Sequence, residues 1–427
     1  MPVCTRGVTA WTTLCQAARC TSSGSASAGT AAASGRAALA TSPAEIGLAV
    51  QPPTPRGMLD WRADALVMLA DLGRIDVDTE RRRVLSAATY SLAALALPPA
   101  DWWTTMTDRG RLRRPVKGRV VGRADLDAVQ DMVALFSQVD QRRGGGHART
   151  AVVQYLTTDV AALLCGCFAD DRIRQDMFTA SAELAYLSGW MAFDNAEHTV
   201  AVQYYHLAVK LAAEANNPAM AGHVLRAMAH QAIDLGHRRE ALELATAATQ
   251  GSRYASASPR ERALLGVVLG RALAANGQGS DAAKALLRAE DDLAAATPDD
   301  AEPGRVFFFG EASLAHETAC ALRDTGDLVG ATREFRRSVR TRKALAFART
   351  HAVTLGYLGS VHAQRGDLAQ ACATWSRALD AMDGVRSGRT RQAAAEIRAT
   401  LAPLRQRGSG TIAGLDERAA TYLATFA

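Results

Sequence analysis

Small side chains recur at fixed spacings along much of this chain, and this pattern limits the folds open to it more than any other feature. Each unit has a small residue, an alanine 12 positions later, a variable residue 16 positions later and a small residue 19 positions later. The alanines fall at 201, 241, 282, 331 and 371, at intervals of 40, 41, 49 and 40 residues. The five units are Gly189, Ala201, Tyr205, Ala208; Ala229, Ala241, Ala245, Ala248; Gly270, Ala282, Leu286, Ala289; Ala319, Ala331, Phe335, Ser338; and Gly359, Ala371, Trp375, Ala378.

Close packing of two antiparallel helices explains such a pattern. Helices approach closely only where the facing positions are Gly, Ala or Ser, and a larger residue of the second helix then fills the groove beside them. In the last two units, Gly326-Asp327 and Gly366-Asp367 place Gly where one helix ends and Asp where the next begins. Aromatic residues make up only 6% of the chain, which favours Ala- and Leu-rich helices over a β-sandwich or barrel. We therefore predict an all-α solenoid of antiparallel helix pairs.

These units resemble tetratricopeptide repeats. The A-x3-F spacing of that repeat matches Ala331 to Phe335 and Ala371 to Trp375. The repeat period of about 40 residues departs from the family's usual length of about 34, so the helices or their connections must be longer. The resemblance implies that the first helix of each pair lines a concave groove.

The rest of the chain divides by composition. Residues 1–57 combine small residues with Pro and few large apolar side chains, which predicts a disordered tail. Residues 58–123 form a helical lead-in and basic linker, 124–405 the repeat array, and 406–427 a linker with a C-terminal helix. Val306 to Phe309 could form a short strand or begin a helix. The basic run 109–123 is expected to be either a solvated linker or a segment that binds phosphate groups. The candidates for nucleic-acid contact are Arg111, Arg113 and Arg114.

A second resemblance covers about residues 75 to 400. Gly144 to Arg149 (GGGHAR) and Gly189 to Asp194 (GWMAFD) are similar to the C-terminal tetratricopeptide-repeat region of actinobacterial helix-turn-helix (XRE-type) transcriptional regulators. In that family, a small N-terminal module binds DNA and the helical array receives a partner or signal, often in sporulation or secondary-metabolite control. Residues 1–57 contain no recognisable helix-turn-helix, so the resemblance does not imply DNA binding by this chain.

No catalytic motif stands out in the sequence. It lacks H-E-x-x-H, G-x-S-x-G, G-x-x-x-x-G-K and C-x-x-C. Gly277, Gly279 and Ala282 fit G-x-G-x-x-A, but they fall in the turn of the third unit, where a dinucleotide site is not expected. His223 and His230 lie seven residues apart, about 10 Å along a helix, too far to share a metal. We expect a non-enzymatic protein with no cofactor and no metal site.

The expected groove mixes cations, imidazoles and an aromatic ring, which suits an extended peptide or an acidic segment of a protein partner. We predict a regulatory scaffold that binds a protein or peptide in a transcriptional pathway. The alternative is a DNA-binding regulator that uses the basic segment or an unrecognised helix-turn-helix. The projected groove residues are Trp190, His223, Arg226, His230, Arg271, His316 and Arg323.

Localisation is expected to be cytoplasmic. The chain has seven Cys, an odd number scattered over 427 residues, which argues against a disulfide framework. No stretch reaches the roughly 20 apolar residues that a membrane span needs, so no membrane partner is expected. The sequence does not predict the oligomeric state.

Overall fold

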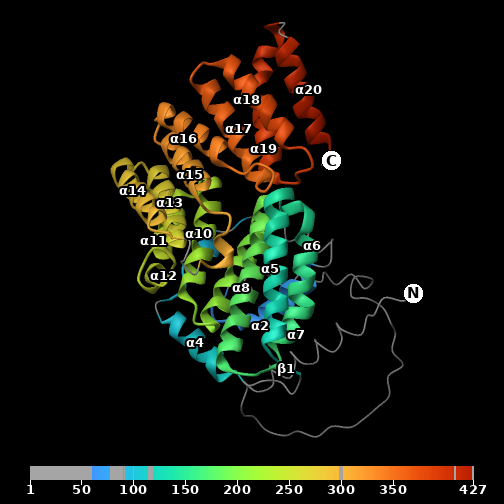
Figure 1. Ribbon diagram of the computed structural model, residues 1–427, viewed down its shortest axis with the longest axis vertical. Helices are drawn as coiled ribbons and strands as arrows, with labels where there is room; N and C mark the ends of the chain where they lie inside the picture. The colour runs from blue at the N-terminus through green and yellow to red at the C-terminus, as the bar shows by residue number, and fades with distance from the viewer. Residues whose placement is uncertain are drawn as a thin grey trace, which may run out of the picture.

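The computed structural model describes residues 60–76, 90, 92–99, 101–113, 119–297, 302–407 and 410–425. Over these ranges the predicted all-α architecture is confirmed, with adjacent helices packed as antiparallel pairs (Figure 1). The described residues contain one pair of short parallel strands. They are β1 (Val120–Val121) and β2 (Cys167–Phe168). The tail predicted over residues 1–57 lies outside the described residues.

Four longer helices of the described residues precede the repeats: α2 (Ala65–Asp76), α4 (Trp102–Leu112), α5 (Arg123–Arg143) and α6 (Gly145–Tyr155). The π-helical segment η3 (Leu156–Val160) links α6 to the four-residue helix α7 (Ala161–Leu164), and the short 3-10 helix η2 (Leu92–Leu95) precedes α4. The repeat region follows as α8 (Asp171–Asp194), α9 (His198–Glu214), α10 (Pro218–Asp234), α11 (Arg238–Ala248), α12 (Ser252–Ala255), α13 (Pro259–Ala275), α14 (Gly279–Ala294), η4 (Gly304–Val306), α15 (Glu311–Asp324), α16 (Leu328–Thr341), α17 (Ala348–Gln364), α18 (Leu368–Ala381), α19 (Gly388–Leu401), η5 (Ala402–Arg407) and α20 (Gly410–Ala424).

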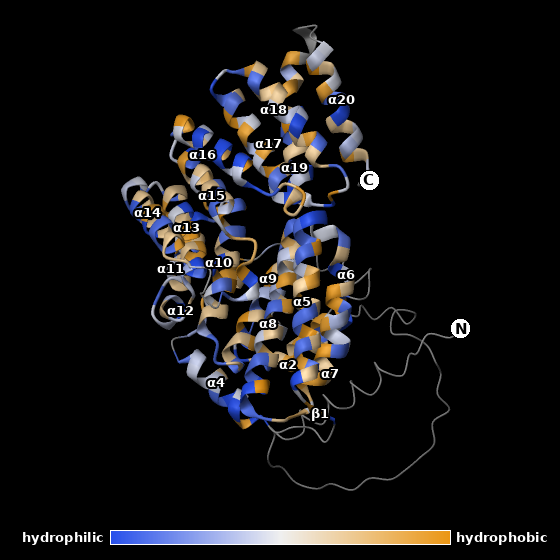
Figure 2. Ribbon diagram, viewed as in Figure 1, coloured by the Kyte–Doolittle hydropathy of each residue, from blue (hydrophilic) through white to orange (hydrophobic). Residues whose placement is uncertain are grey.

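The predicted small-residue pattern marks the interface within each helix pair. The pairs are α8/α9, α10/α11, α13/α14, α15/α16 and α17/α18. A Cβ atom added to Gly189 would come within 2.8 Å of the Tyr205 ring, and one added to Gly270 would come equally close to Leu286. The Trp375 indole is fully buried against Gly359 in the fifth pair. In these three pairs the larger residue of the second helix therefore fills the space that the glycine opposite leaves open. In Figure 2, hydrophobic and hydrophilic residues are mixed along helices such as α14 and α16.

The turns within the pairs share one backbone conformation. Gly326 and Gly366 have φ angles of +88° and +81°, and the Asp residue after each accepts a hydrogen bond from the first turn of the following helix. The first pair takes the same turn with Ala196, whose φ is +66°. An L-residue with a Cβ adopts this left-handed region at a cost that glycine avoids.

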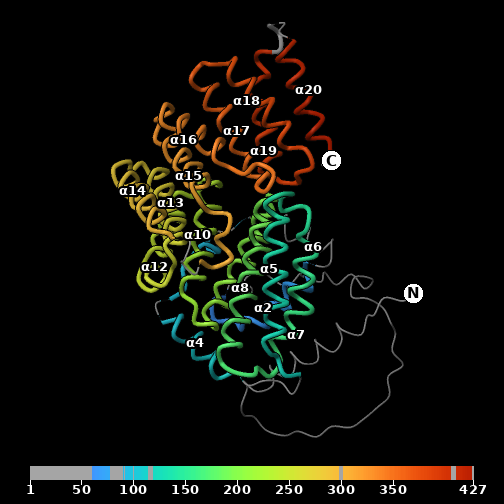
Figure 3. Tube along the Cα trace, viewed as in Figure 1, coloured from blue at the N-terminus to red at the C-terminus, as the bar shows by residue number. Residues whose placement is uncertain are grey.

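The interval of 49 residues between Ala282 and Ala331 is longer than the others because it contains an insertion. This insertion turns into the concave side of the array. Between α14 and α15 the chain forms η4, and Val306 and Phe309 are buried against the main core (Figure 3). The segment Val306 to Phe309 forms neither a strand nor the start of a helix. Val306 closes a three-residue 3-10 helix, and Phe307 and Phe308 form the turn that follows.

The array curves until its C-terminal pairs rest on its N-terminal helices. In Figure 1, α17 and α19 lie directly above α5 and α6. The loop before α19 joins the α5–α6 corner through backbone hydrogen bonds, from Gly146 N to Arg386 O at 3.0 Å and from Arg386 N to Arg143 O at 2.7 Å. The Arg349 guanidinium at the start of α17 lies 2.9 Å from Asp140 of α5 and 3.3 Å from Asp194 of α8. The concave side is thereby enclosed.

The lead-in helices pack onto the first repeat. Trp102 Nε1 on α4 donates to the Trp61 carbonyl at 2.6 Å, and Thr107 Oγ1 donates to the Ala213 carbonyl at the end of α9. Arg113 lies 2.8 Å from Asp64 and 2.7 Å from Glu214. The part of the basic run up to Arg113 is therefore attached to the array.

We expect Trp375→Ala to lower the free energy of unfolding by ~3–5 kcal/mol, because the indole is fully buried and its removal leaves a cavity. Urea denaturation measures the change. Arg377→Ala, on the exposed face of the same helix, is the control and should change stability by less than about 0.5 kcal/mol. A loss below about 1 kcal/mol for Trp375→Ala would contradict the packing of the fifth pair.

We expect Ala196→Gly to raise stability by ~0.5–1 kcal/mol, because glycine adopts the observed positive φ without strain. Gly366→Ala should have the opposite sign. No atom lies within 4 Å of an added Cβ there, so its effect reports the backbone alone. Equal stability of both variants and the wild type in thermal denaturation would contradict the left-handed turns.

Candidate functional site

The predicted groove residues do come together, on the first helices α8, α10, α13 and α15 of four consecutive pairs. Six of them are buried rather than open to solvent. Their exposed fractions range from 0% for His223 to 9% for Trp190. Arg323 is partly exposed. The predicted residues therefore share the inner side of the first helices, where six of the seven are covered by other parts of the chain. The six buried residues are Trp190, His223, Arg226, His230, Arg271 and His316.

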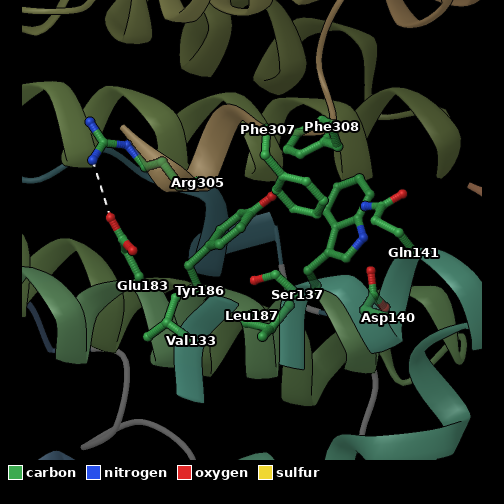
Figure 4. Close-up of a pocket in the computed structure, with 11 residues that line it drawn as sticks. Val133, Ser137, Asp140, Gln141, Glu183, Tyr186, Leu187, Arg305, Phe307 and Phe308 are labelled. Atoms are coloured by element: carbon green, nitrogen blue, oxygen red, sulfur yellow. Dashed lines mark hydrogen bonds and ion pairs between the residues drawn. The ribbon is translucent and has the colours of Figure 1, made fainter. Parts of the chain in front are cut away.

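The insertion between α14 and α15 covers much of this concave face. Arg305 donates two hydrogen bonds to the Glu261 carboxylate of α13, at 2.7 and 2.8 Å, and a third to Glu183 of α8 at 3.2 Å. Figure 4 shows Arg305 reaching across to Glu183, and Tyr186 pointing toward Phe307. Because bidentate Arg–carboxylate pairs are strong and directional, Arg305 fixes the insertion inside the curve of the array.

Two small hollows remain beside this insertion. One, of about 30 Å³, lies between α5 and α8 and is bounded by Asp140, Tyr186 and Arg305. The other, of about 40 Å³, lies deeper, among α8, α10, α15 and α17, and Arg226 and Arg342 line it. Trp190, Gln141 and Phe308 line both, so these three residues separate the two spaces.

The buried imidazole of His223 is held in its neutral form. Arg226 Nη2 donates to His223 Nε2 at 3.0 Å, so this ring nitrogen carries no proton. The other nitrogen, Nδ1, lies 3.2 Å from Glu261. Burial, and Arg226 after it, lower the pKa of His223 to about 3 despite the nearby carboxylate. Although burial opposes it, the Arg305 guanidinium holds the pKa of Glu261 at about 2.

An open groove of about 450 Å³ lies at the far ends of the same first helices. Asp234 of α10, Arg271 of α13, Arg323 of α15, Tyr357 of α17 and Glu396 of α19 line it. Two of these, Arg271 and Arg323, belong to the predicted groove. Arg271 is already paired, with Glu317 at 2.8 Å and Asp234 at 3.2 Å, while the Arg323 guanidinium lies over the Tyr357 ring at 5.2 Å. The groove thus alternates fixed positive and negative groups around one aromatic face.

The candidates for nucleic-acid contact have different surroundings. Arg111 is exposed and lies 3.9 Å from Asp108. Arg113 is bound between Asp64 and Glu214, and these carboxylates raise its pKa although burial alone would lower it. Arg114 lies outside the described residues. The part of the chain that the structure describes therefore offers one exposed arginine of the three.

Over the described ranges, no three or more His, Cys, Asp or Glu side chains come together in a way that could hold a metal ion. No helix in those ranges is long and apolar enough to cross a membrane.

Sequence reasoning missed several charged residues of the interior. They are Asp140, Asp194, Arg342, Arg349 and Arg389, and Arg349 and Arg389 meet the first helices only because α17 and α19 return to them. One signal in the sequence could have indicated part of this interior. The interval of 49 residues is longer than the others, which indicates an insertion, and Arg305 lies in it.

The comparisons with known proteins add no family. No model of a known protein family matches this chain, and no curated protein is similar to it at a significant level.

We expect stability to fall as the pH falls from 6.5 toward 4, because the unfolded chain then binds a proton at His223 that the folded protein excludes. One such proton contributes a slope of about 1.4 kcal/mol per pH unit. His223→Gln keeps a donor and an acceptor but cannot titrate, so its unfolding free energy should depend less steeply on pH. His147→Gln, at an exposed position, is the control. Identical slopes for His223→Gln and the wild type in urea titrations between pH 4 and 6.5 would contradict a neutral buried imidazole.

Proposed function

We propose that this protein is a non-enzymatic regulatory scaffold of the tetratricopeptide type that binds a protein or peptide partner in its open groove. The resemblance to the repeat region of helix-turn-helix regulators supports a role in a transcriptional pathway, and the odd, scattered set of seven Cys supports the cytoplasm. The observation that supports the proposal is the groove of about 450 Å³, to which consecutive first helices each contribute side chains. This volume falls within the range of about 300–1,000 Å³ typical of ligand pockets.

The groove chemistry favours an extended peptide over a compact apolar ligand. Arg323 and Tyr357 present a cation above an aromatic face, and Asp234 and Glu396 present carboxylates nearby. Asp234 is engaged by Arg271, and the Arg323 guanidinium contacts the neighbouring Asp324 carboxylate at 2.9 Å. A ligand would therefore meet the remaining N–H groups of Arg323, the Tyr357 ring and Glu396. Charged and aromatic groups at fixed spacing can read alternate side chains of a bound segment.

Selection from a displayed peptide library tests the proposal with the full chain. We expect peptides that bind the wild type to bind an Arg323→Glu variant at least about tenfold more weakly, because an attractive charge becomes repulsive. Arg288→Glu makes the same charge change at an exposed position of α14, outside the groove, and should leave affinity unchanged.

Two results would contradict the proposal. One is a library that yields no peptide whose binding depends on Arg323. The other is tight binding to duplex DNA that weakens steeply with salt and is lost in Arg111→Gln, which would favour the DNA-binding alternative.

A further inference from the structure

The deeper hollow, of about 40 Å³, is lined by hydrogen-bond donors that have no acceptor. Among the described residues, no partner contacts the indole Nε1 of Trp190 or the Nε atoms of the four arginines that line this hollow. The one unpartnered ring nitrogen there, His230 Nε2, lies 3.6 Å from the Asp234 carboxylate. Among the described residues that line the hollow, no buried side-chain carboxylate oxygen lacks a hydrogen-bond partner. The four arginines are Arg226, Arg342, Arg349 and Arg389.

Two of these arginines also lack a counterion. Arg226 Nη2 bonds to the Tyr186 hydroxyl and to His223, each at 3.0 Å. Arg342 Nη2 donates to the Ala312 carbonyl at 2.8 Å and to the Ser338 hydroxyl at 3.0 Å. No carboxylate in the described part of the chain lies within 4 Å of either guanidinium. Both side chains are more than nine-tenths buried.

The nearby carboxylates are already engaged by other arginines. Asp140 and Asp194 contact Arg349, and Asp234 and Glu317 contact Arg271. Each of these two arginines therefore contacts two negative groups. The hydrogen bonds of Arg226 and Arg342 go to neutral groups, and Glu317 acts on Arg342 only from beyond 4 Å.

Burial of an uncompensated guanidinium is costly, because arginine keeps its proton at any ordinary pH. Rings offset part of this cost for Arg226, whose guanidinium lies over Tyr186 and Trp190 at 5.8 and 5.7 Å. For Arg342 no ring contact of this kind is present among the described residues, and burial lowers its pKa to about 10. A negatively charged group with several acceptor oxygens would satisfy both the charge and the free N–H donors.

We propose that this hollow binds an oxyanion, a carboxylate or a phosphate group, between Arg226 and Arg342. Trp190 Nε1 and Arg349 Nε supply further N–H donors from its wall. The space suits one such group rather than a peptide chain, so the ligand is a small anion or the charged end of a larger molecule. This site is separate from the open groove, and it does not depend on the function proposed for that groove.

Calorimetric titration of the full chain at pH 7 tests the site, with inorganic phosphate and succinate as the two probes and sodium chloride at matched ionic strength as the reference. We expect phosphate, succinate or both to bind with one site per chain and to raise the melting temperature by about 3–5 °C at concentrations well above Kd. Binding of phosphate alone, or of succinate alone, identifies which oxyanion the site prefers.

Two variants locate the binding. Arg342→Gln should weaken binding at least about tenfold, and Trp190→Phe, which removes the indole N–H, should weaken it severalfold. Arg340→Gln removes an exposed arginine two positions away and should bind as the wild type does. In chloride alone, Arg342→Gln should melt no lower than the wild type, because it removes a buried charge that has no counterion.

The proposal is overturned if neither probe shifts the melting temperature beyond the chloride reference. It is also overturned if Arg340→Gln loses as much affinity as Arg342→Gln, because binding would then take place on the outer surface. Neither result bears on peptide capture by the open groove.

Discussion

The enclosed interior of this protein depends on one buried cluster of charges, in which Arg349 joins the fifth helix pair to the first helices. Its guanidinium contacts Asp140 and Asp194, and Asp194 also accepts hydrogen bonds from Ser387 Oγ and the Gly145 N–H, both at 2.9 Å. Burial, and the Asp194 carboxylate after it, raise the pKa of the Asp140 carboxyl although Arg349 lies beside it. The attraction within such a cluster is largely offset by the cost of removing its charges from water, so breaking one partner matters more than the net contribution of the intact cluster.

Closure changes what the concave face can do. A solenoid that stays open presents its first helices to solvent along their whole length. In this chain the C-terminal pairs and the insertion around Arg305 cover the middle of that face, which leaves an open groove at one end and a donor-rich hollow inside. The two spaces differ in chemistry, since Arg323, Tyr357 and Glu396 mix charges in the groove while uncompensated arginines line the hollow.

The sequence predicted local packing well because that packing depends on residues close together in the chain. Gly359 and Trp375 lie 16 positions apart, and helix geometry alone brings them together. It also predicted which faces point inward, from Trp190 in α8 to His316 in α15. It could not predict that these faces are buried, because burial depends on Asp140 meeting Arg349 from 209 positions away. Arg113 shows the same limit: its charge suggested phosphate contact, but its partner Glu214 is 101 positions distant.

A double-mutant cycle between Asp140 and Arg349 tests the closure most directly. The free energy of unfolding is measured for the wild type, Asp140→Asn, Arg349→Gln and the double variant. A closed array predicts a coupling energy of about 1–3 kcal/mol, because the two side chains contact each other in the interior. A coupling energy within about 0.3 kcal/mol of zero would show that α5 and α17 do not meet, and the enclosed interior would be contradicted.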